Sequence, residues 1–433
     1  MFPADFAYAR ARSLDEALDL LDEAHAAGEE AKLIAGGQSL LPMMKLRLAA
    51  PQVLIDIAGL KELRTGGWTA GLGGGFNVLI GALTTYRQLD RDRFYREGHP
   101  VDHDGQQGRT GIVPAMTDAL AVLADPQVRA RGTIGGAVAH GDPAADLPAV
   151  LLALNATVTI ASRKGRHEET VLRPGRAGPG ARHAELDVGK REIPLDDFIQ
   201  GIYTTDLAED EVVTHVRIST PGARGSAYEK FPHPASHLPL AGVCAVLRLR
   251  DGLIDGAEVA VTGISPRPYR ATETERMLAG ADPAPSTLAA AAAEVTKLPG
   301  GHRATLLGDQ HASAPYRAHL AEVLTRRALA KALARATTTE LPSALNRGKW
   351  LSITHNHRHQ GGMTPYGAYR PAANAPRGPA PADGPRRVRR RRRAAWHAAR
   401  LRRPQPAGAR AHHRHRRHRG ARSGRRRRRL HRS

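Results

Sequence analysis

The spacing of apolar residues predicts that short strands alternate with helices over the first 220 residues. Apolar positions at steps of three and four residues indicate a helix over Ser13–Ala27, with Ser13 as its cap and Glu16 as the capping-box partner. Short apolar runs predict strands at Lys32–Ala35, Val53–Ile57, Val78–Ala82, Asn155–Ala161 and Val212–Ile218. Further helices are expected to start at Thr84–Tyr86 and to span Val113–Ala124 and Leu147–Leu154.

The block after residue 220 has a different order, with strands first and helices afterwards. Asp251-Gly252 is a hairpin turn signal between two apolar runs. Strands are predicted at Gly225–Phe231, Ala241–Leu249 and Ala257–Gly263, and helices at Ala271–Leu278, Leu288–Thr296 and Ala314–Arg335. Strands followed by helices indicate an α+β domain.

Three stretches show no strand or helix pattern: Gly66–Asn77, Asp90–Gly111 and Arg163–Lys190. The first is rich in glycine, the second is polar and aperiodic, and the third is rich in Arg, Gly and Pro. Structureless loops of about 20 residues are uncommon in compact domains. We interpret these stretches either as exposed insertions or as local changes of reading frame.

Charge divides the chain into two unlike parts. The formal net charge is +22, yet residues 341–433 hold 27 Lys+Arg and one acid, while the first 340 residues hold 41 acids against 37 basic residues. The basic part contains 26 Arg and a single Lys, Lys349. GC-rich DNA read in the wrong frame would give this bias, because Arg has GC-rich codons and Lys does not. The other interpretation is a disordered arm that binds nucleic acid, although four aromatic residues offer little base stacking.

The remaining composition excludes several classes of protein. The only cysteine is Cys244, so an intrachain disulfide and a Cys-ligated zinc or iron–sulfur site are excluded. No apolar run reaches the about 18 residues of a membrane helix, and the N-terminus lacks the apolar region of a signal peptide. A cytoplasmic protein without a membrane span is therefore expected. A body of 340 residues predicts two or three domains.

Two glycine-containing stretches carry the candidate chemistry. The first, AGGQSLLP from Ala35, follows a predicted strand, and backbone N–H groups beside two glycines can converge on an anion, with Ser39 as a hydroxyl donor. It lacks the third glycine of a dinucleotide fingerprint, and Pro42 stands where a helix should continue. The second, RGTIGG from Arg131, also suits a tight turn around a phosphate.

Charged residues near the second stretch have two interpretations each. Asp146 can accept a hydrogen bond from a ribose hydroxyl or can cap the helix that follows. Arg129 and Arg131 are either phosphate partners or solvated surface residues. Three aromatic residues, Tyr203, Tyr228 and His233, are involved either in packing or in contact with a cofactor.

Taken together, these stretches resemble the FAD-binding medium subunit of molybdenum hydroxylases, the carbon monoxide dehydrogenase and xanthine dehydrogenase group. The resemblance spans residues 1–336 with the motif order preserved. The motifs are AGGQSLLPMMKLRLA (35–49), IGALTTY (80–86), ADPQVRARGTIGG (124–136), GDPAADLPAVLLAL (141–154), FIQGIYTT (198–205), AYEKF (227–231), PASH (234–237), AGVCAVLRL (241–249) and YRAHLAEVLTRRAL (316–329).

The resemblance implies an α+β fold. It has a two-lobed FAD-binding domain of the vanillyl-alcohol-oxidase (PCMH) type, with lobe 1 at 1–57 and lobe 2 at 58–220. A C-terminal α+β domain at 221–336 follows, and the Arg-rich tail at 337–433 is expected to be disordered. The cofactor-binding residues implied by the resemblance are Leu33, Ile34, Ala35, Gly36, Gly37, Gln38, Ser39, Leu40, Leu123, Thr133, Ile134, Gly135, Gly136, Ala137, Asp146, Val213 and Lys230. Relatives often have Asn where this chain has Ala137, so one side-chain hydrogen bond is expected to be lost.

The resemblance also implies partners. They are a molybdopterin-binding large subunit and a [2Fe–2S] small subunit, in a dimer of heterotrimers, with electrons passing from the clusters to FAD and then to an external acceptor. No residue of this chain is expected to be an acid–base catalyst. Two alternatives stay open: a stand-alone FAD-dependent oxidoreductase of the same fold, and a nucleic-acid-binding protein that acts through the basic tail.

Overall fold

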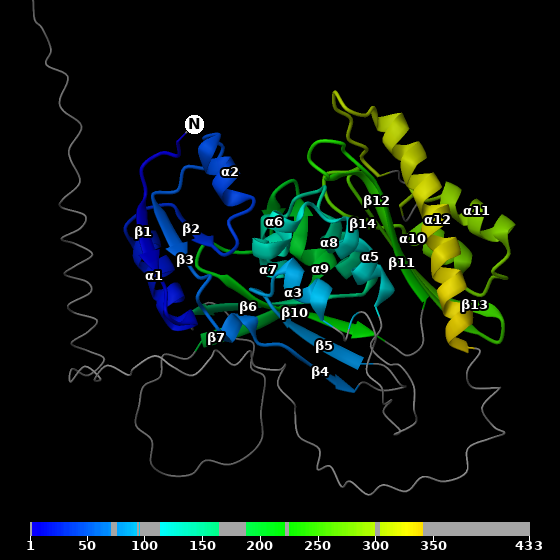
Figure 1. Ribbon diagram of the computed structural model, residues 1–433, viewed down its shortest axis with the longest axis horizontal. Coiled ribbons are helices and arrows are strands. Elements are labelled where there is room, and N and C mark those ends of the chain that lie inside the picture. Colours follow the sequence, from blue (N-terminus) through cyan, green and yellow to red (C-terminus); the bar gives the residue numbers. More distant parts are fainter. Residues whose placement is uncertain are drawn as a thin grey trace, which may run out of the picture. The chain divides into compact units, whose positions relative to one another are not determined.

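The computed structural model describes residues 2–70, 76–92, 95, 113–163, 188–220, 225–298 and 304–340. Within these ranges the chain forms a mixed α/β fold (Figure 1). Residues 341–433, most of the 90–111 stretch and residues 164–187 lie outside them, so the expectations for the basic tail and for the two longer insertions stay predictions. The proposed domain limits are likewise untested.

Three short parallel strands form the first sheet. Its order is β1-β3-β2, in which β1 and β2 both pair in parallel with β3. A helix connects each strand to the next in sequence, as parallel pairing requires. The elements are β1 (Ala7–Arg10), α1 (Leu14–Ala26), β2 (Ala31–Ile34), α2 (Leu40–Lys45) and β3 (Val53–Asp56).

Ser13 caps α1, as the sequence predicted. Its Oγ accepts a hydrogen bond from the Glu16 N–H at 3.1 Å. The Glu16 carboxylate accepts from the N–H of Arg12 at 2.9 Å, one residue before the position that a capping box uses. Leu18 and Leu21 are buried, which confirms the apolar face of this helix.

The middle of the chain forms a five-stranded antiparallel sheet of order β4-β5-β10-β6-β7. Thr85 and Gln88 form a full capping box at the start of α3. The elements are η1 (Glu62–Arg64), β4 (Gly67–Ala70), β5 (Phe76–Gly81), α3 (Tyr86–Arg91), α5 (Pro114–Val122), α6 (Pro126–Arg131), α7 (Ile134–His140), α8 (Asp146–Ala153), β6 (Thr157–Arg163), β7 (Val188–Pro194), α9 (Leu195–Phe198), the hairpin β8 (Ile199–Gly201) and β9 (Thr204–Thr205), and β10 (Val212–Thr220).

The C-terminal part is a four-stranded antiparallel sheet of order β11-β12-β13-β14 with helices after it. Asp251 and Gly252 both have positive φ (54° and 80°), which is the turn that their pairing predicted between β12 and β13. The elements are β11 (Gly225–Pro232), β12 (Pro239–Arg250), β13 (Leu253–Thr262), β14 (Tyr269–Arg270), α10 (Thr272–Leu278), α11 (Pro285–Ala293) and α12 (Ala314–Glu340).

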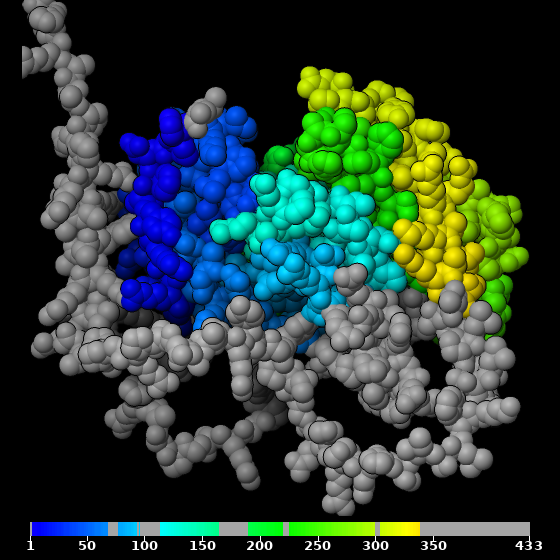
Figure 2. Space-filling model, viewed as in Figure 1, coloured from blue at the N-terminus to red at the C-terminus, as the bar shows by residue number. Residues whose placement is uncertain are grey.

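The C-terminal sheet contributes to two hydrophobic cores. Cys244 and Val246 of β12 pack into the core of the middle sheet, whereas Val243 and Ala245 pack into the core beneath α12. Because successive side chains of a strand point to opposite faces, β12 serves both cores at once. Figure 2 shows the segments from blue to yellow following one another across the visible face.

Several elements differ from the sequence expectations. Pro42 lies inside α2, where we expected no helix; it is the third helical residue, and its missing N–H falls in the first turn, which has no intrahelical acceptor. β4 occupies part of the stretch that was read as featureless. β1, β7, α6 and α7 had no predicted counterpart. Among the helices that the structure describes, none is long and apolar enough to cross a membrane.

Candidate cofactor site

The first glycine stretch forms the connection between β2 and α2. Gly37 has φ +73°, a left-handed conformation that glycine adopts without strain. Gly36 lies against the end of α6, because a Cβ there would stand 2.1 Å from the carbonyl oxygen of Arg131. The structure thus brings the first stretch into direct contact with Arg131 and Gly132, the first two residues of the second stretch.

The amides of this loop are open to a ligand. The main-chain N–H groups of Gly36, Gly37, Gln38 and Ser39 donate to no acceptor within the described part of the chain, and the Ser39 hydroxyl makes no capping bond there either. Gln38 turns its side-chain amide back to the carbonyl of Gly36 at 3.4 Å. Four unbonded N–H groups and one hydroxyl on a partly exposed turn are an anion-binding arrangement.

The second glycine stretch is the start of a helix, which corrects our interpretation of it as a tight turn. Thr133 caps α7, and its Oγ1 accepts from the Gly136 N–H at 3.1 Å. The N–H groups of Ile134 and Gly135 donate at 3.0 and 2.9 Å to carbonyls of the segment before α3. These three amides are therefore already bonded within the protein, unlike those of the first loop.

Close packing explains the glycines of the second stretch. A Cβ on Gly132 would stand 2.4 Å from the Tyr86 ring, and one on Gly135 would stand 2.4 Å from the Cβ of Ala82. Gly136 is exposed, and a Cβ there would meet only the hydroxyl of its own helix cap, at 2.8 Å. Ala137 follows, half-buried, in the first turn of α7.

The two arginines before α7 have different roles. Arg129 donates from Nη1 to the carbonyls of Leu123 and Ala124 at 2.7 and 2.9 Å, which secures the turn where Ala124 has φ +43°. This favours the structural interpretation of Arg129. Arg131 is exposed and pairs with no carboxylate among the described residues. Its position beside Gly36 keeps it a candidate phosphate partner.

Asp146 and Lys230, both implied by the resemblance, form one buried ion pair. The Lys230 Nζ lies 2.9 and 3.2 Å from the two carboxylate oxygens, and the side chains are 3% and 4% exposed. Tyr228 donates from its hydroxyl to Asp146 Oδ1 at 2.7 Å, and Lys230 also donates to the carbonyl of His237 at 2.8 Å. Ala145 is the cap of α8, so the capping interpretation of Asp146 is wrong. The pair joins α8 to β11.

Burial dominates the electrostatics of this pair. It raises the pKa of Asp146, while Lys230 and Tyr228 act in the opposite direction. The same burial, together with the neighbouring carboxylate, raises the pKa of Tyr228 well above its ordinary value. Tyr228 is thus a neutral donor that the sequence offered only as an ambiguous aromatic residue.

The remaining implied residues fall into two groups. Leu33 and Ile34 of β2, Ala35 of the loop and Leu40 of α2 are half-buried and continuous with the open amides. Leu123 and Val213 are 7% and 5% exposed and belong to the core of the middle sheet.

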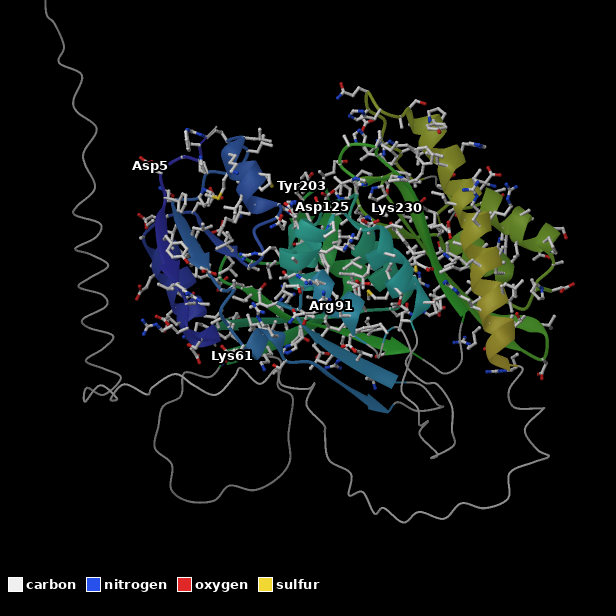
Figure 3. All side chains as sticks on the ribbon, in the orientation of Figure 1. Asp5, Lys61, Arg91, Asp125, Tyr203 and Lys230 are labelled. Atoms are coloured by element: carbon white, nitrogen blue, oxygen red, sulfur yellow. The ribbon has the colours of Figure 1, made fainter. Side chains whose placement is uncertain are left out.

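The sequence analysis named the motif FIQGIYTT (198–205) and Tyr203 but did not predict the β8–β9 hairpin that these residues form. Tyr203, at its tip, has φ +51° and is 54% exposed, and its ring lies 4.9 Å from the His140 ring. Its N–H donates to the carbonyl of Gly141 at the end of α7. Aromatic residues rarely adopt a left-handed backbone conformation, and such conformations are frequent at functional sites. No sequence pattern predicts this conformation at Tyr203. Figure 3 labels Tyr203 and Lys230, which lie between α2 and α12 in this view.

Burial lowers the pKa of the His140 imidazole, which favours its neutral form beside Tyr203. His233 accepts at Nδ1 from the N–H groups of Ala235 and Ser236 and therefore holds a local turn. Within the described ranges, no group of three or more His, Cys, Asp or Glu side chains could hold a metal ion. The organised polar chemistry of the site is thus that of an anion-binding loop beside a buried ion pair.

Two protein-family models match the chain. One, described as the FAD binding domain in molybdopterin dehydrogenase, matches residues 4–173, and the CO dehydrogenase flavoprotein C-terminal domain matches residues 226–332. The chain is 32% identical to the glyceraldehyde dehydrogenase medium chain of Sulfolobus acidocaldarius over 331 residues, covering 76% of this chain and 98% of the relative. It is 34% identical to the nicotine 6-hydroxylase medium subunit of Paenarthrobacter nicotinovorans over 331 residues, covering 76% and 97%.

A solved structure shows the same arrangement. Carbon monoxide dehydrogenase from Hydrogenophaga pseudoflava is similar with a TM-score of 0.61 and 33% identity, covering 78% of this chain and 100% of the other. The two family models together match residues between 4 and 332, so neither of them extends into the C-terminal tail.

Proposed function

Since the chain belongs to the family of FAD-binding medium subunits of molybdenum hydroxylases, we propose that it transfers electrons from iron–sulfur clusters of a partner subunit to an external acceptor. Members of this family bind FAD and are subunits of oxidoreductase complexes. The direction of electron flow and the cluster donor are our proposal. The proposal rests on the loop Gly36–Ser39, whose N–H groups are open to a ligand. It also rests on the single cysteine of the chain, because a Cys-ligated iron–sulfur cluster must then belong to a partner subunit.

The residues of this loop fit the phosphate groups of FAD. Four N–H groups and the Ser39 hydroxyl would hold the diphosphate, because they have no acceptor among the described residues. Gly36 allows the loop to approach Arg131, whose guanidinium is free to add positive charge. When bound, FAD supplies the carrier that connects one-electron donors to two-electron acceptors. The chain's own part is to bind and orient that group.

Further features of the proposal follow from family membership. We propose the vanillyl-alcohol-oxidase (PCMH) type for the FAD-binding part, and as partners a molybdopterin-binding large subunit and a [2Fe–2S] small subunit. We extend this to a dimer of heterotrimers. Cys244 is buried, and its burial raises the thiol pKa, so it is suited to packing rather than to cluster ligation.

The cofactor part of the proposal has a direct test. The full chain is purified with an affinity tag, and its visible spectrum is recorded before and after addition of FAD. We expect the two absorption bands of an oxidised flavin. A chain that stays colourless after FAD is added, although circular dichroism shows it folded, would contradict cofactor binding.

The electron-transfer part needs the assembled complex. The iron–sulfur centres are reduced with dithionite, excess reductant is removed, and reoxidation by NAD⁺, oxygen or a quinone analogue is followed with and without FAD. For the acceptor that reoxidises the FAD-containing complex fastest, we expect reoxidation to become slower when FAD is removed. Adding FAD back should restore the rate. Equal rates in both forms would refute a role for this chain in the electron path.

A further inference from the structure

The surface beside the cofactor loop exposes an unusual number of apolar side chains. α2 buries only Met44, whereas Leu41, Leu46 and Leu48 are 38%, 58% and 71% exposed. Single exposed leucines are ordinary on soluble proteins, but three such leucines lie here within eight residues of the chain. We call the residues Leu41, Leu46 and Leu48, with Lys45 and Arg47, the α2 surface.

The backbone just after α2 contains a strained residue. Arg47 has φ +62°, a left-handed conformation that is unfavourable for a non-glycine residue. The N–H of Leu48 bonds back to the carbonyl of Met43, and Arg47 donates from Nε to the carbonyl of Phe2 at 3.2 Å. Strain of this kind persists where the surrounding structure enforces it, often at binding surfaces.

The same segment is positively charged. No Asp or Glu occurs from Ala31 to Ile55, which contains Lys32, Lys45 and Arg47. Lys45 and Arg47 pair with no carboxylate in the part of the chain that the structure describes. Exposed apolar residues that alternate along the chain with two unpaired cations, Lys45 and Arg47, are complementary to an anionic partner with an apolar contact patch.

We propose that the α2 surface docks the iron–sulfur subunit through an acidic face near its cluster. This inference rests on the proposed function. The cluster must come within electron-transfer distance of the flavin ring of FAD, whose diphosphate Gly36–Ser39 would hold, and the α2 surface begins two residues after that loop. A thiolate-ligated [2Fe–2S] cluster carries net negative charge, which the two cations complement.

The test uses the tagged full chain, isolated with its partners from the cells that make the complex. FAD, iron and acid-labile sulfide are measured per chain. The variant Leu46→Glu/Leu48→Glu places two carboxylates in exposed positions and is expected to fold. We expect it to retain FAD and to lose co-purified iron and sulfide by on the order of tenfold or more, because an apolar anchor at an interface contributes at least that much. Lys45→Glu should weaken retention in the same direction.

Leu253→Glu is the matched control, since Leu253 is 46% exposed at the distant β12–β13 turn. It should keep both FAD and iron. Iron retained by Leu46→Glu/Leu48→Glu would overturn the docking proposal and leave the proposed function intact. A wild-type chain that co-purifies with FAD but without iron would instead refute the proposed association with an iron–sulfur subunit. A wild-type dimer, seen by light scattering and lost in the variant, would assign the surface to a second copy of this chain and overturn the proposal.

Discussion

Replacement of Gly36 by alanine tests whether the contact between the two glycine stretches shapes the cofactor site. The added Cβ would lie 2.1 Å from the carbonyl oxygen and 2.8 Å from the carbonyl carbon of Arg131, whereas ordinary contacts begin at 3.4 Å. Both atoms belong to the backbone at the end of α6, so neither can rotate away. The loop must therefore move by roughly 1 Å, at an overpacking cost of about 1–3 kcal/mol.

If the displaced loop presents its amides poorly, that cost appears in the affinity for FAD. A loss of about 1–3 kcal/mol corresponds to a dissociation constant raised about 5- to 150-fold. The assay titrates the FAD-free full chain with FAD and follows quenching of flavin fluorescence, alongside the midpoint of thermal unfolding. Gly67→Ala is the control, because a Cβ there meets nothing within 4 Å. Gly36→Ala with wild-type affinity and an unchanged unfolding midpoint would refute the reasoning.

The other predictions concern single polar groups. Ser39→Ala should raise the dissociation constant for FAD about fivefold, the value of one lost hydrogen bond near 1 kcal/mol, with no change in unfolding. Lys230→Met should lower the free energy of unfolding by about 3–5 kcal/mol at neutral pH, since it leaves the Asp146 carboxylate buried without its cationic partner. Acid should reduce this loss, because protonation of Asp146 removes the buried charge. A loss of the same size at every pH would contradict this reasoning. Burial opposes ionisation of Asp118, but Arg335 and a backbone N–H outweigh it and hold its pKa below the ordinary value. The stability that Asp118 contributes is thus fully present above its pKa in the unfolded chain and is lost as pH falls through its pKa in the folded protein. Asp118→Asn should remove this pH-dependent contribution, which acid denaturation curves of both proteins would measure.

The elements that the sequence predicted are those with a strong local cause. Ser13 caps α1 and Asp251-Gly252 turns the β12–β13 hairpin because a side-chain acceptor and positive φ act within a few residues. The order of strands and helices after residue 220 was correct for the same reason: each apolar run there is long and bounded by turn signals.

The errors arose where tertiary contacts decide. Gly132 and Gly135 were expected to form a tight turn, yet they lie at the start of α7, where close packing against Tyr86 and Ala82, distant in the sequence, requires them. Asp146 was expected to bind a ribose hydroxyl or to cap a helix; the cap is Ala145, and Asp146 pairs with Lys230, which lies 84 residues away in the sequence. The resemblance implied a cofactor role for both residues, which stays a prediction, and the structure shows that they form an ion pair with each other.

The shared strand β12 has a consequence for how the chain denatures. Its alternate residues complete two cores, and Arg335 of α12 holds Asp118 of α5 at 2.7 Å. Opening either core would expose the face of this sheet that lines it and would remove support from the strand that lines the other core. The FAD-binding part and the C-terminal part should consequently melt as one cooperative unit, and a fragment cut near residue 220 would lack the apolar face of β12 against which its own core closes.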